Sequence, residues 1–172
     1  MIDVDRLFRS YHGQLVRYLT RRLGDRDWAE EVAQEVFVRA LRQKQLTNER
    51  AWLFTVANNL VRDDARKEER RRRHLALLRE EERDRVVEPE PTSLERMQEA
   101  ALARRAVEQL AERDRLALLM REEGLDYGEI AEALDLSVGS VGTTLSRARR
   151  RLMEAYESLQ RESERRGGNA AS

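Results

Sequence analysis

The chain contains no cysteine and few prolines, histidines and aromatic residues. Its 172 residues include two prolines and two histidines, and 5% of them are aromatic. Without cysteine the chain cannot form disulfides, thiolate nucleophiles or cysteine zinc sites. The two histidines show no close spacing with other metal ligands, so we expect neither a metal nor another cofactor. Few aromatics and prolines also disfavour a β-sandwich or barrel.

Long apolar runs and catalytic motifs are also missing. The N-terminus, MIDVDRLFRSYHG, has no stretch of signal-peptide length, and no apolar span reaches the length of a transmembrane helix. The sequence therefore predicts a cytoplasmic protein. It has no phosphate-cradling glycine loop and no convergent set of histidines and carboxylates, so we do not expect an enzyme.

Charged residues are abundant and segregated along the chain. They make up 38% of it, although the formal net charge is +0. Basic runs occur at 66–73 (RKEERRRR) and 147–151 (RARRR), and acidic residues collect elsewhere, as at 80–82. Opposed patches suit a chain that binds both a nucleic acid and a protein. The alternative is that these runs are solvated faces of ordinary helices.

Helical spacing of apolar residues predicts an all-α protein of two small helical domains joined by a polar linker. Three helices, at about 3–23, 27–43 and 49 onward, share one core; Gly24 ends the first and Asp27 caps the second. The third continues as a polar extension to Arg73. We place the domains at 1–75 and 94–160, the linker with Pro89 and Pro91 at 76–93, and a flexible tail at 161–172.

The C-terminal domain carries the strongest local signals. Helices are expected from Thr92 or Ser93, from 112 to 123, and from about 127 to 134. Asp126 and Glu129 have the spacing of a capping box. A tight turn at 135–136 then leads to a last helix capped by Ser137. A short helix, a tight turn and a second helix form a helix-turn-helix motif.

The last helix has one apolar face and one polar face. We expect its polar face to enter the major groove of DNA, with N-terminal residues near bases and later arginines near phosphates. The candidate contacts are Ser137, Ser140, Thr143, Thr144, Arg147, Arg150 and Arg151. Two glycines, Gly139 and Gly142, lie in its first turns. The alternative is a helical hairpin within a plain bundle.

The third helix brings aromatic, amide and basic side chains together. Aromatics beside amides and arginines suit stacking on unpaired bases. The candidates are Trp52, Phe54, Asn58, Asn59, Asp63 and Arg66. Trp52 is equally compatible with a place in the core, because it has helical spacing with Val56 and Leu60.

Three segments together resemble extracytoplasmic-function sigma factors, the compact two-domain members of the sigma-70 family of bacterial RNA polymerase subunits. The segments are AEEVAQEVFVRAL (29–41), AWLFTVANNLVRDDAR (51–66) and DYGEIAEALDLSVGSVGTTLSRARRRL (126–152). Their order along the chain makes the resemblance more specific than a helix-turn-helix alone.

The resemblance implies a partner for each part of the chain. The 29–41 helix would bind the clamp helices of the polymerase β′ subunit through Glu31, Gln34, Glu35 and Phe37. The loop 44–50, with Lys44 and Asn48, would capture a flipped base of the minus-10 element, and the following helix would open the duplex. The C-terminal domain would bind the β flap and the minus-35 element. An anti-sigma factor would regulate the free, monomeric protein.

The chain departs from the family pattern at three positions. Gly142 replaces a lysine and Thr144 an arginine, and both replaced residues normally contact DNA. Asn58 stands where an arginine is common, before the family asparagine at Asn59. Two other functions remain open: a regulator that binds an operator without polymerase, and a helical adaptor without a DNA role.

Overall fold

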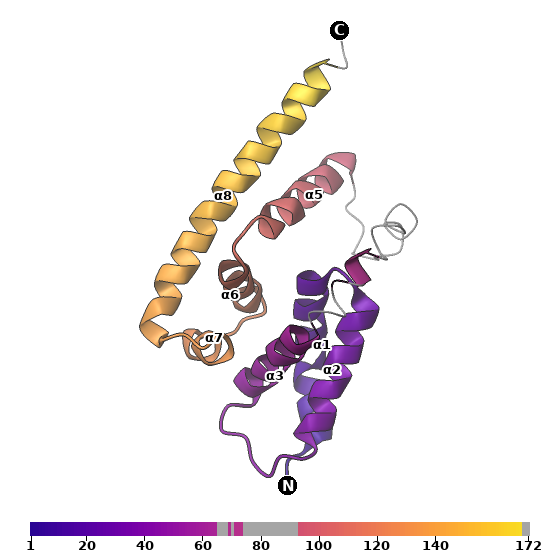
Figure 1. Ribbon diagram of the computed structural model, residues 1–172, viewed down its shortest axis with the longest axis vertical. Helices are drawn as coiled ribbons and strands as arrows, with labels where there is room; N and C mark the ends of the chain where they lie inside the picture. The colour runs from indigo at the N-terminus through magenta and orange to yellow at the C-terminus, as the bar shows by residue number, and fades with distance from the viewer. Residues whose placement is uncertain (65–68, 70, 74–92, 170–172) are drawn as a thin grey trace.

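Helices are the only regular secondary structure among the residues that the structure describes. This computed structural model describes residues 1–64, 69, 71–73 and 93–169, and Figure 1 shows the arrangement of its helices. The predicted all-α fold is confirmed. Arg66 lies outside the described residues, and so do residues 76–92 of the predicted linker, which include Thr92.

Three helices form the N-terminal bundle: α1 (Val4–Leu23), α2 (Arg26–Ala40) and α3 (Glu49–Asp63). Each begins after a polar residue whose side chain accepts a hydrogen bond from a backbone N–H of the first turn; these residues are Asp3, Asp25 and Asn48. The prediction that Asp27 caps α2 is wrong, because the helix begins two residues earlier, after Asp25. Helix α2 also ends at Ala40, before the expected position 43.

The core of this bundle comes from the apolar face of each helix. Leu15, Tyr18 and Leu19 of α1 and Phe54 of α3 are all fully buried. The rings of Tyr18 and Phe54 lie 5.0 Å apart, centroid to centroid. Gly24, which ends α1 with φ 69°, adopts the left-handed conformation that favours glycine and lets the chain turn directly into α2.

The C-terminal half contains α5 (Leu94–Glu108), α6 (Glu112–Glu122), α7 (Tyr127–Leu134) and α8 (Val138–Asn169). Ser93 caps α5, and the predicted capping box of Asp126 and Glu129 is present at α7. Helix α8 is a single helix of 32 residues. Residues 161–169 therefore continue α8 and do not form the separate tail that the sequence predicted.

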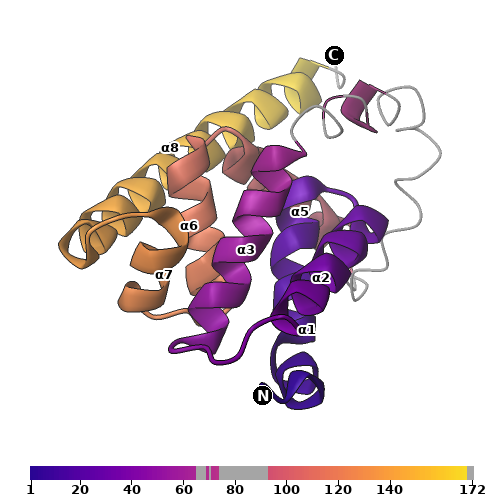
Figure 2. The ribbon, with the colours of Figure 1, turned by 60° about the horizontal axis from the view of Figure 1, so that its bottom comes forward.

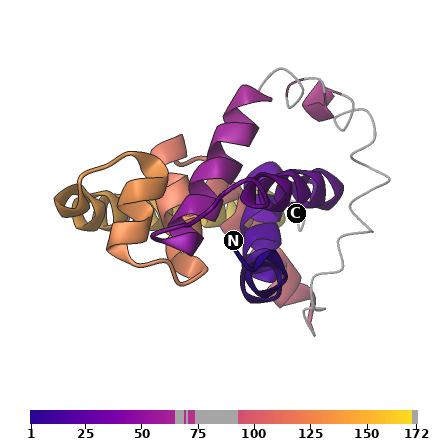
Figure 3. The same ribbon diagram turned by 90° about the horizontal axis from the view of Figure 1, so that it is seen from below.

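The two halves pack directly against each other. Helix α3 lies between the other N-terminal helices and the C-terminal half, beside α7, as Figures 2 and 3 show. Helix α1 also contacts α6. One cluster of contacting apolar side chains includes residues of both halves, from Leu7 of α1 to Leu145 of α8. The two halves therefore share one continuous core.

Candidate nucleic-acid and protein interfaces

Helices α7 and α8 form the helix-turn-helix motif that the sequence predicted. The turn contains Asp135, whose φ of 54° is the left-handed conformation, and the backbone N–H of Leu136 donates to the carbonyl of Ala131 at 2.8 Å. Val141 and Leu145 of α8 are fully buried beneath α7. The opposite face of α8 is thereby held outward, which is the geometry needed to enter a DNA groove.

The outward face of α8 contains some predicted contact residues and two that the prediction missed. Ser137, Thr143 and Arg150 are exposed, and Ser140 is half-buried. Ser146 and Arg149 are also exposed and were missed. Their position could have been found from helical spacing, because Ser146 lies three residues after Thr143 and four before Arg150.

Thr144 lies on the other side of this helix. Its exposed fraction is 4%, so its side chain faces the interior of the motif and not the solvent. The prediction that Thr144 contacts DNA is therefore wrong for this conformation. The physical reason is its place directly before Leu145, on the apolar side of α8.

Arg147 and Arg151 bind a buried carboxylate. Asp114 of α6 is 1% exposed, and its Oδ2 accepts from Arg147 Nε at 3.2 Å and from Arg151 Nη1 at 3.3 Å. The hydrogen bond from Arg147 lowers the pKa of Asp114, although burial opposes this shift. The side chains of both arginines remain partly exposed, at 36% and 49%, so they attach α8 to α6 and still reach the surface.

Helix α3 divides its predicted contact residues between the interior and the surface. Phe54 is fully buried, Trp52 is half-buried, and Asn59 and Asp63 are exposed. Asn58, at 2% exposed, is buried. The prediction that Asn58 contacts DNA is therefore wrong for this conformation.

The buried side chain of Asn58 connects three helices. Its Oδ1 accepts from Tyr18 Oη at 2.7 Å and from Arg22 Nη1 at 2.8 Å, and its Nδ2 donates to the carbonyl of Ala133 in α7 at 3.2 Å. Burial raises the pKa of Tyr18 to about 12, so the phenol stays protonated and donates this hydrogen bond. Asn58 is thus a structural residue at the junction of the two halves.

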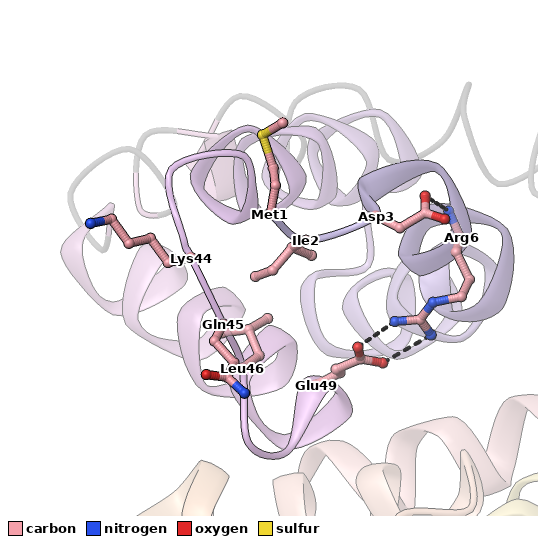
Figure 4. Close-up of a pocket in the computed structure, with 8 residues that line it drawn as sticks. All are labelled: Met1, Ile2, Asp3, Arg6, Lys44, Gln45, Leu46 and Glu49. Carbon is pink, nitrogen blue, oxygen red and sulfur yellow. Dashed lines mark hydrogen bonds and ion pairs between the residues drawn. The ribbon is translucent and has the colours of Figure 1, made fainter.

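An open pocket of about 450 Å³ lies beside the loop between α2 and α3. Figure 4 shows Lys44 at its edge, pointing away from the pocket, and Arg6 facing Glu49 across one side. Arg6 Nη1 donates to Glu49 Oε2 at 3.1 Å. The pocket is lined by Met1, Ile2, Asp3, Arg6, Lys44, Gln45, Leu46 and Glu49. Asn48, predicted to contact DNA, is exposed and also caps α3.

One face of helix α2 exposes carboxylate and amide side chains. Glu31, Gln34 and Glu35 are exposed, and Glu31 accepts from Arg71 Nη2 at 3.1 Å. Phe37 is 5% exposed and packs against Phe8, with ring centroids 5.1 Å apart. The three polar residues are therefore accessible, and their role in binding a protein stays a prediction. The prediction that Phe37 contacts the partner is wrong for this conformation, because its ring is buried against Phe8.

Two family models match the halves of the chain separately. The model described as Sigma-70 region 2 matches residues 7–71, and the model described as Sigma-70, region 4 matches residues 100–152. The RNA polymerase sigma-H factor of Pseudomonas aeruginosa is 30% identical over 172 aligned residues, which cover 92% of this chain and 88% of that protein. The chain belongs to the sigma-70 family of RNA polymerase sigma factors.

Other relatives agree with this assignment. The sigma factor is 29% identical to the RNA polymerase sigma factor YlaC of Bacillus subtilis, over 86% of this chain and 88% of that protein. It is 33% identical to the ECF RNA polymerase sigma factor BldN of Streptomyces coelicolor, over 86% of this chain and 58% of that protein. The predicted membership of the extracytoplasmic-function group is confirmed, and the regulator and adaptor alternatives are set aside.

A solved structure has the same fold. The sigma factor RpoE of Bartonella quintana, in complex with the anti-sigma factor NepR, superposes with a TM-score of 0.65 at 20% identity, over 90% of this chain and 97% of that chain. None of the helices in the described ranges of our sigma factor combines the length and apolar character that a bilayer span requires.

Proposed function

We propose that this sigma factor binds core RNA polymerase through α2 and contacts promoter DNA through two separate elements, α3 with its preceding loop and the outward face of α8. The observation that carries the proposal is the presence, in one chain, of a helix-turn-helix with a solvent-facing polar face and a second helix with exposed amide and half-buried aromatic side chains. A simple operator-binding regulator needs only the first of these.

The outward face of α8 suits duplex DNA of the minus-35 element. Arg149 and Arg150 are exposed and form no ion pair with any residue in the described ranges, so both can reach phosphates. Thr143 and Ser146 precede them on the same side, where hydroxyl groups can contact base edges. Arg147 and Arg151 together carry two positive charges, and the carboxylate of Asp114 neutralises one of them. The pair therefore offers one net positive charge to DNA.

The loop before α3 and the exposed part of α3 suit the minus-10 element. The pocket beside the loop has room for one unstacked base, and the Arg6–Glu49 pair offers both donors and acceptors at its wall. Trp52 is half-buried, so one part of its ring is free to stack on a base of the separated strand. Asn59 and Asp63 follow on α3.

The exposed face of α2 suits the β′ clamp helices. Glu31, Gln34 and Glu35 lie within about one helical turn, and the aromatic contact between Phe37 and Phe8 keeps this turn in place. An anti-sigma factor that covers the same face would keep the sigma factor from polymerase. The Bartonella quintana protein was solved in complex with the anti-sigma factor NepR, which supports an anti-sigma partner for this chain.

Run-off transcription with core polymerase and a promoter library tests the proposal. We expect promoter-specific transcripts with the sigma factor and none with core alone. Glu35→Lys should abolish them by reversing a charge on the α2 face, and Glu157→Lys, an exposed change on the distal part of α8, serves as the matched control. Tight, palindromic DNA binding without polymerase, together with no transcript, would contradict the proposal.

A further inference from the structure

A charged carboxylate is buried directly behind the arginines of α8. Asp114, in the first turn of α6, is 1% exposed. Its Oδ1 accepts from Arg147 Nη2 at 2.5 Å, and its Oδ2 accepts from Arg147 Nε at 3.2 Å and from Arg151 Nη1 at 3.3 Å. Buried charges in proteins are paired, and this one is paired with two cations. One carboxylate between two guanidinium groups leaves the cluster with one uncompensated positive charge.

The contact with Asp114 fixes the plane of the Arg147 guanidinium group. Arg147 binds both carboxylate oxygens, and a bidentate contact sets orientation as well as position. Asp114 occupies Nε and Nη2 of Arg147 and Nη1 of Arg151, which leaves Nη1 of Arg147 and Nη2 of Arg151 to bind another acceptor. Because the two side chains are 36% and 49% exposed, such an acceptor can approach from the solvent.

The two arginines lie on one edge of the outward face of α8. They are four residues apart and point to the same side of the helix, toward α6. Like charges at this spacing repel each other, and Asp114 offsets the repulsion by drawing both groups to its Oδ2. A helix of about 10 Å diameter fills a major groove about 12 Å wide, so the edges of its DNA-facing side lie against the phosphate backbones.

Holding these side chains in place has two opposite effects on DNA binding. An unrestrained arginine loses rotamer freedom when it binds, which weakens affinity by about twofold to tenfold for each side chain. Asp114 removes most of this loss, because folding has already ordered both arginines. The carboxylate also removes one positive charge, which reduces the salt slope by about one and the affinity by about fivefold at about 0.15 M salt.

We propose that Asp114 is a positioning residue for promoter binding. Its buried carboxylate holds the guanidinium groups of Arg147 and Arg151 side by side, in the arrangement that binds the oxygen atoms of one backbone phosphate of DNA. The ordering of the two arginines rests on the geometry of the free protein alone, whereas its use on DNA rests on the proposed contact between α8 and duplex DNA.

Nuclear magnetic resonance of the arginine side chains measures the ordering without DNA. In the full chain, the heteronuclear NOE of the Arg147 Nε–H group should match that of the α8 backbone; Arg147→Lys assigns the signal. In Asp114→Asn, whose backbone amide spectrum checks the fold, the NOE should fall to that of Arg165, an exposed arginine near the end of α8. A wild-type Arg147 signal as mobile as that of Arg165, or one unchanged in Asp114→Asn, would overturn the proposal.

Duplex binding separates positioning from charge. The probe is a short fluorescent duplex that spans the minus-35 region of a promoter obtained from the library, and anisotropy gives its affinity over a range of salt. Asp114→Asn should steepen the salt slope by about one. It should nevertheless bind about threefold to tenfold more weakly at about 0.3 M salt, where the added charge contributes less.

Glu132→Gln is the matched control for the change in charge. Glu132 is exposed on α7, so its replacement raises the net charge of the helix-turn-helix equally without touching the arginines of α8. This variant should bind the duplex as tightly as wild type or more tightly. If Asp114→Asn tightens binding as the control does, the carboxylate acts through its charge alone and the proposal is overturned.

Two sets of arginine variants test whether Asp114 acts through its partners. Arg147→Lys keeps the charge but lacks the planar fork, so it should lose affinity at an unchanged salt slope. When Arg147→Ala and Arg151→Ala are both present, Asp114→Asn should have no further effect on affinity. A weakening of the same size in that background would assign the loss to the fold of the domain and would overturn the positioning role.

The outcomes distinguish this inference from the proposed function. If the wild-type chain binds no duplex at any salt concentration, the proposed contact of α8 with DNA fails, and the use of the ordered arginines on DNA fails with it. The side-chain spectra still decide whether Asp114 orders them. If duplex binding and promoter-specific transcription are present but Arg147 is mobile in the wild type, the proposed function stands and the positioning role is overturned.

Discussion

The two helices that we propose to contact DNA, α3 and α8, differ in how their candidate contacts are held. Helix α3 lies in the middle of the molecule, so part of its polar and aromatic set serves the fold: Phe54 fills the core and Asn58 joins the two halves. Helix α8 lies at the edge, with one face buried and the other free. A polar or aromatic residue on a central helix is therefore weak evidence of binding, whereas on an edge helix the same residue is stronger evidence.

The departures from the family pattern follow this difference. Asn58 has the size and the hydrogen-bonding groups to meet Tyr18, Arg22 and the Ala133 carbonyl at once. Thr144 is buried on the apolar side of α8. Gly142 is half-buried, and a Cβ built there would lie 3.6 Å from the Tyr127 ring, which is ordinary contact. Only at Gly142 does the missing side chain leave a place that a longer residue could use.

The largest expected effect is a loss of stability from a change in the central helix, α3. Phe54→Ala should lower the free energy of unfolding by about 3 to 5 kcal/mol, because it leaves a cavity beside Tyr18. Trp52→Ala, at a half-buried position of the same helix, should cost less stability and weaken binding of single-stranded DNA. Urea unfolding of both variants measures the contrast. Equal losses of stability would show that Trp52 is as much a core residue as Phe54.

The next effect concerns the attachment of α8 to α6. Asp114→Asn should lower the free energy of unfolding by about 2 kcal/mol at pH 7, since a buried carboxylate that binds two arginines is lost. Because the pKa of Asp114 is lowered in the folded state, its stabilisation is complete above the ordinary carboxyl pKa of about 4 and is lost as pH falls through the folded value.

Unfolding curves recorded between neutral and acid pH check this assignment. The variant should lose less stability than wild type as the pH falls below about 4. If the free energy of unfolding falls equally with acid pH in the two proteins, other carboxylates, Glu129 among them, account for the whole loss of stability in acid.

A smaller effect sharpens the description of the free face of α8. Arg150→Ala should weaken binding of minus-35 duplex DNA and reduce the slope of log affinity against log salt by about one, with no change in the unfolding free energy. Arg147→Ala should change both quantities, because it also leaves the buried Asp114 with one partner fewer. Fluorescence anisotropy at several salt concentrations measures the slopes. Identical behaviour of the two variants would argue against a purely DNA-facing role for Arg150 and a double role for Arg147.

The smallest expected effect comes from placing at Gly142 the lysine that the family pattern has there. Gly142→Lys should tighten duplex binding, steepen the salt slope by about one and raise helix stability by up to about 1 kcal/mol. The new side chain fits, because its Cβ meets only the edge of Tyr127. The same anisotropy titration tests it. Weaker binding would show instead that the DNA backbone approaches α8 closely at Gly142.

The amino-acid sequence alone was sufficient for most features that depend on neighbours along the chain. The period of apolar residues predicted the helices, the Asp126–Glu129 spacing predicted the cap of α7, and the ordered motifs identified the sigma-70 family. These features come from interactions within a few residues, which a linear pattern records. The predicted start of α2 was two residues too late, because Asp25 and Asp27 are both good caps and local rules rank them equally.

Only the tertiary structure decided which polar residues bind one another across the molecule. Arg50 and Glu129 are 79 positions apart, Asn58 and Ala133 are 75 apart, and Asp114 and Arg147 are 33 apart. No periodicity links such residues, because their contact depends on which helix faces which after packing. The sequence thus determined the helices and the family, and the packing of α3 against α7 decided which side chains remain free to contact a promoter.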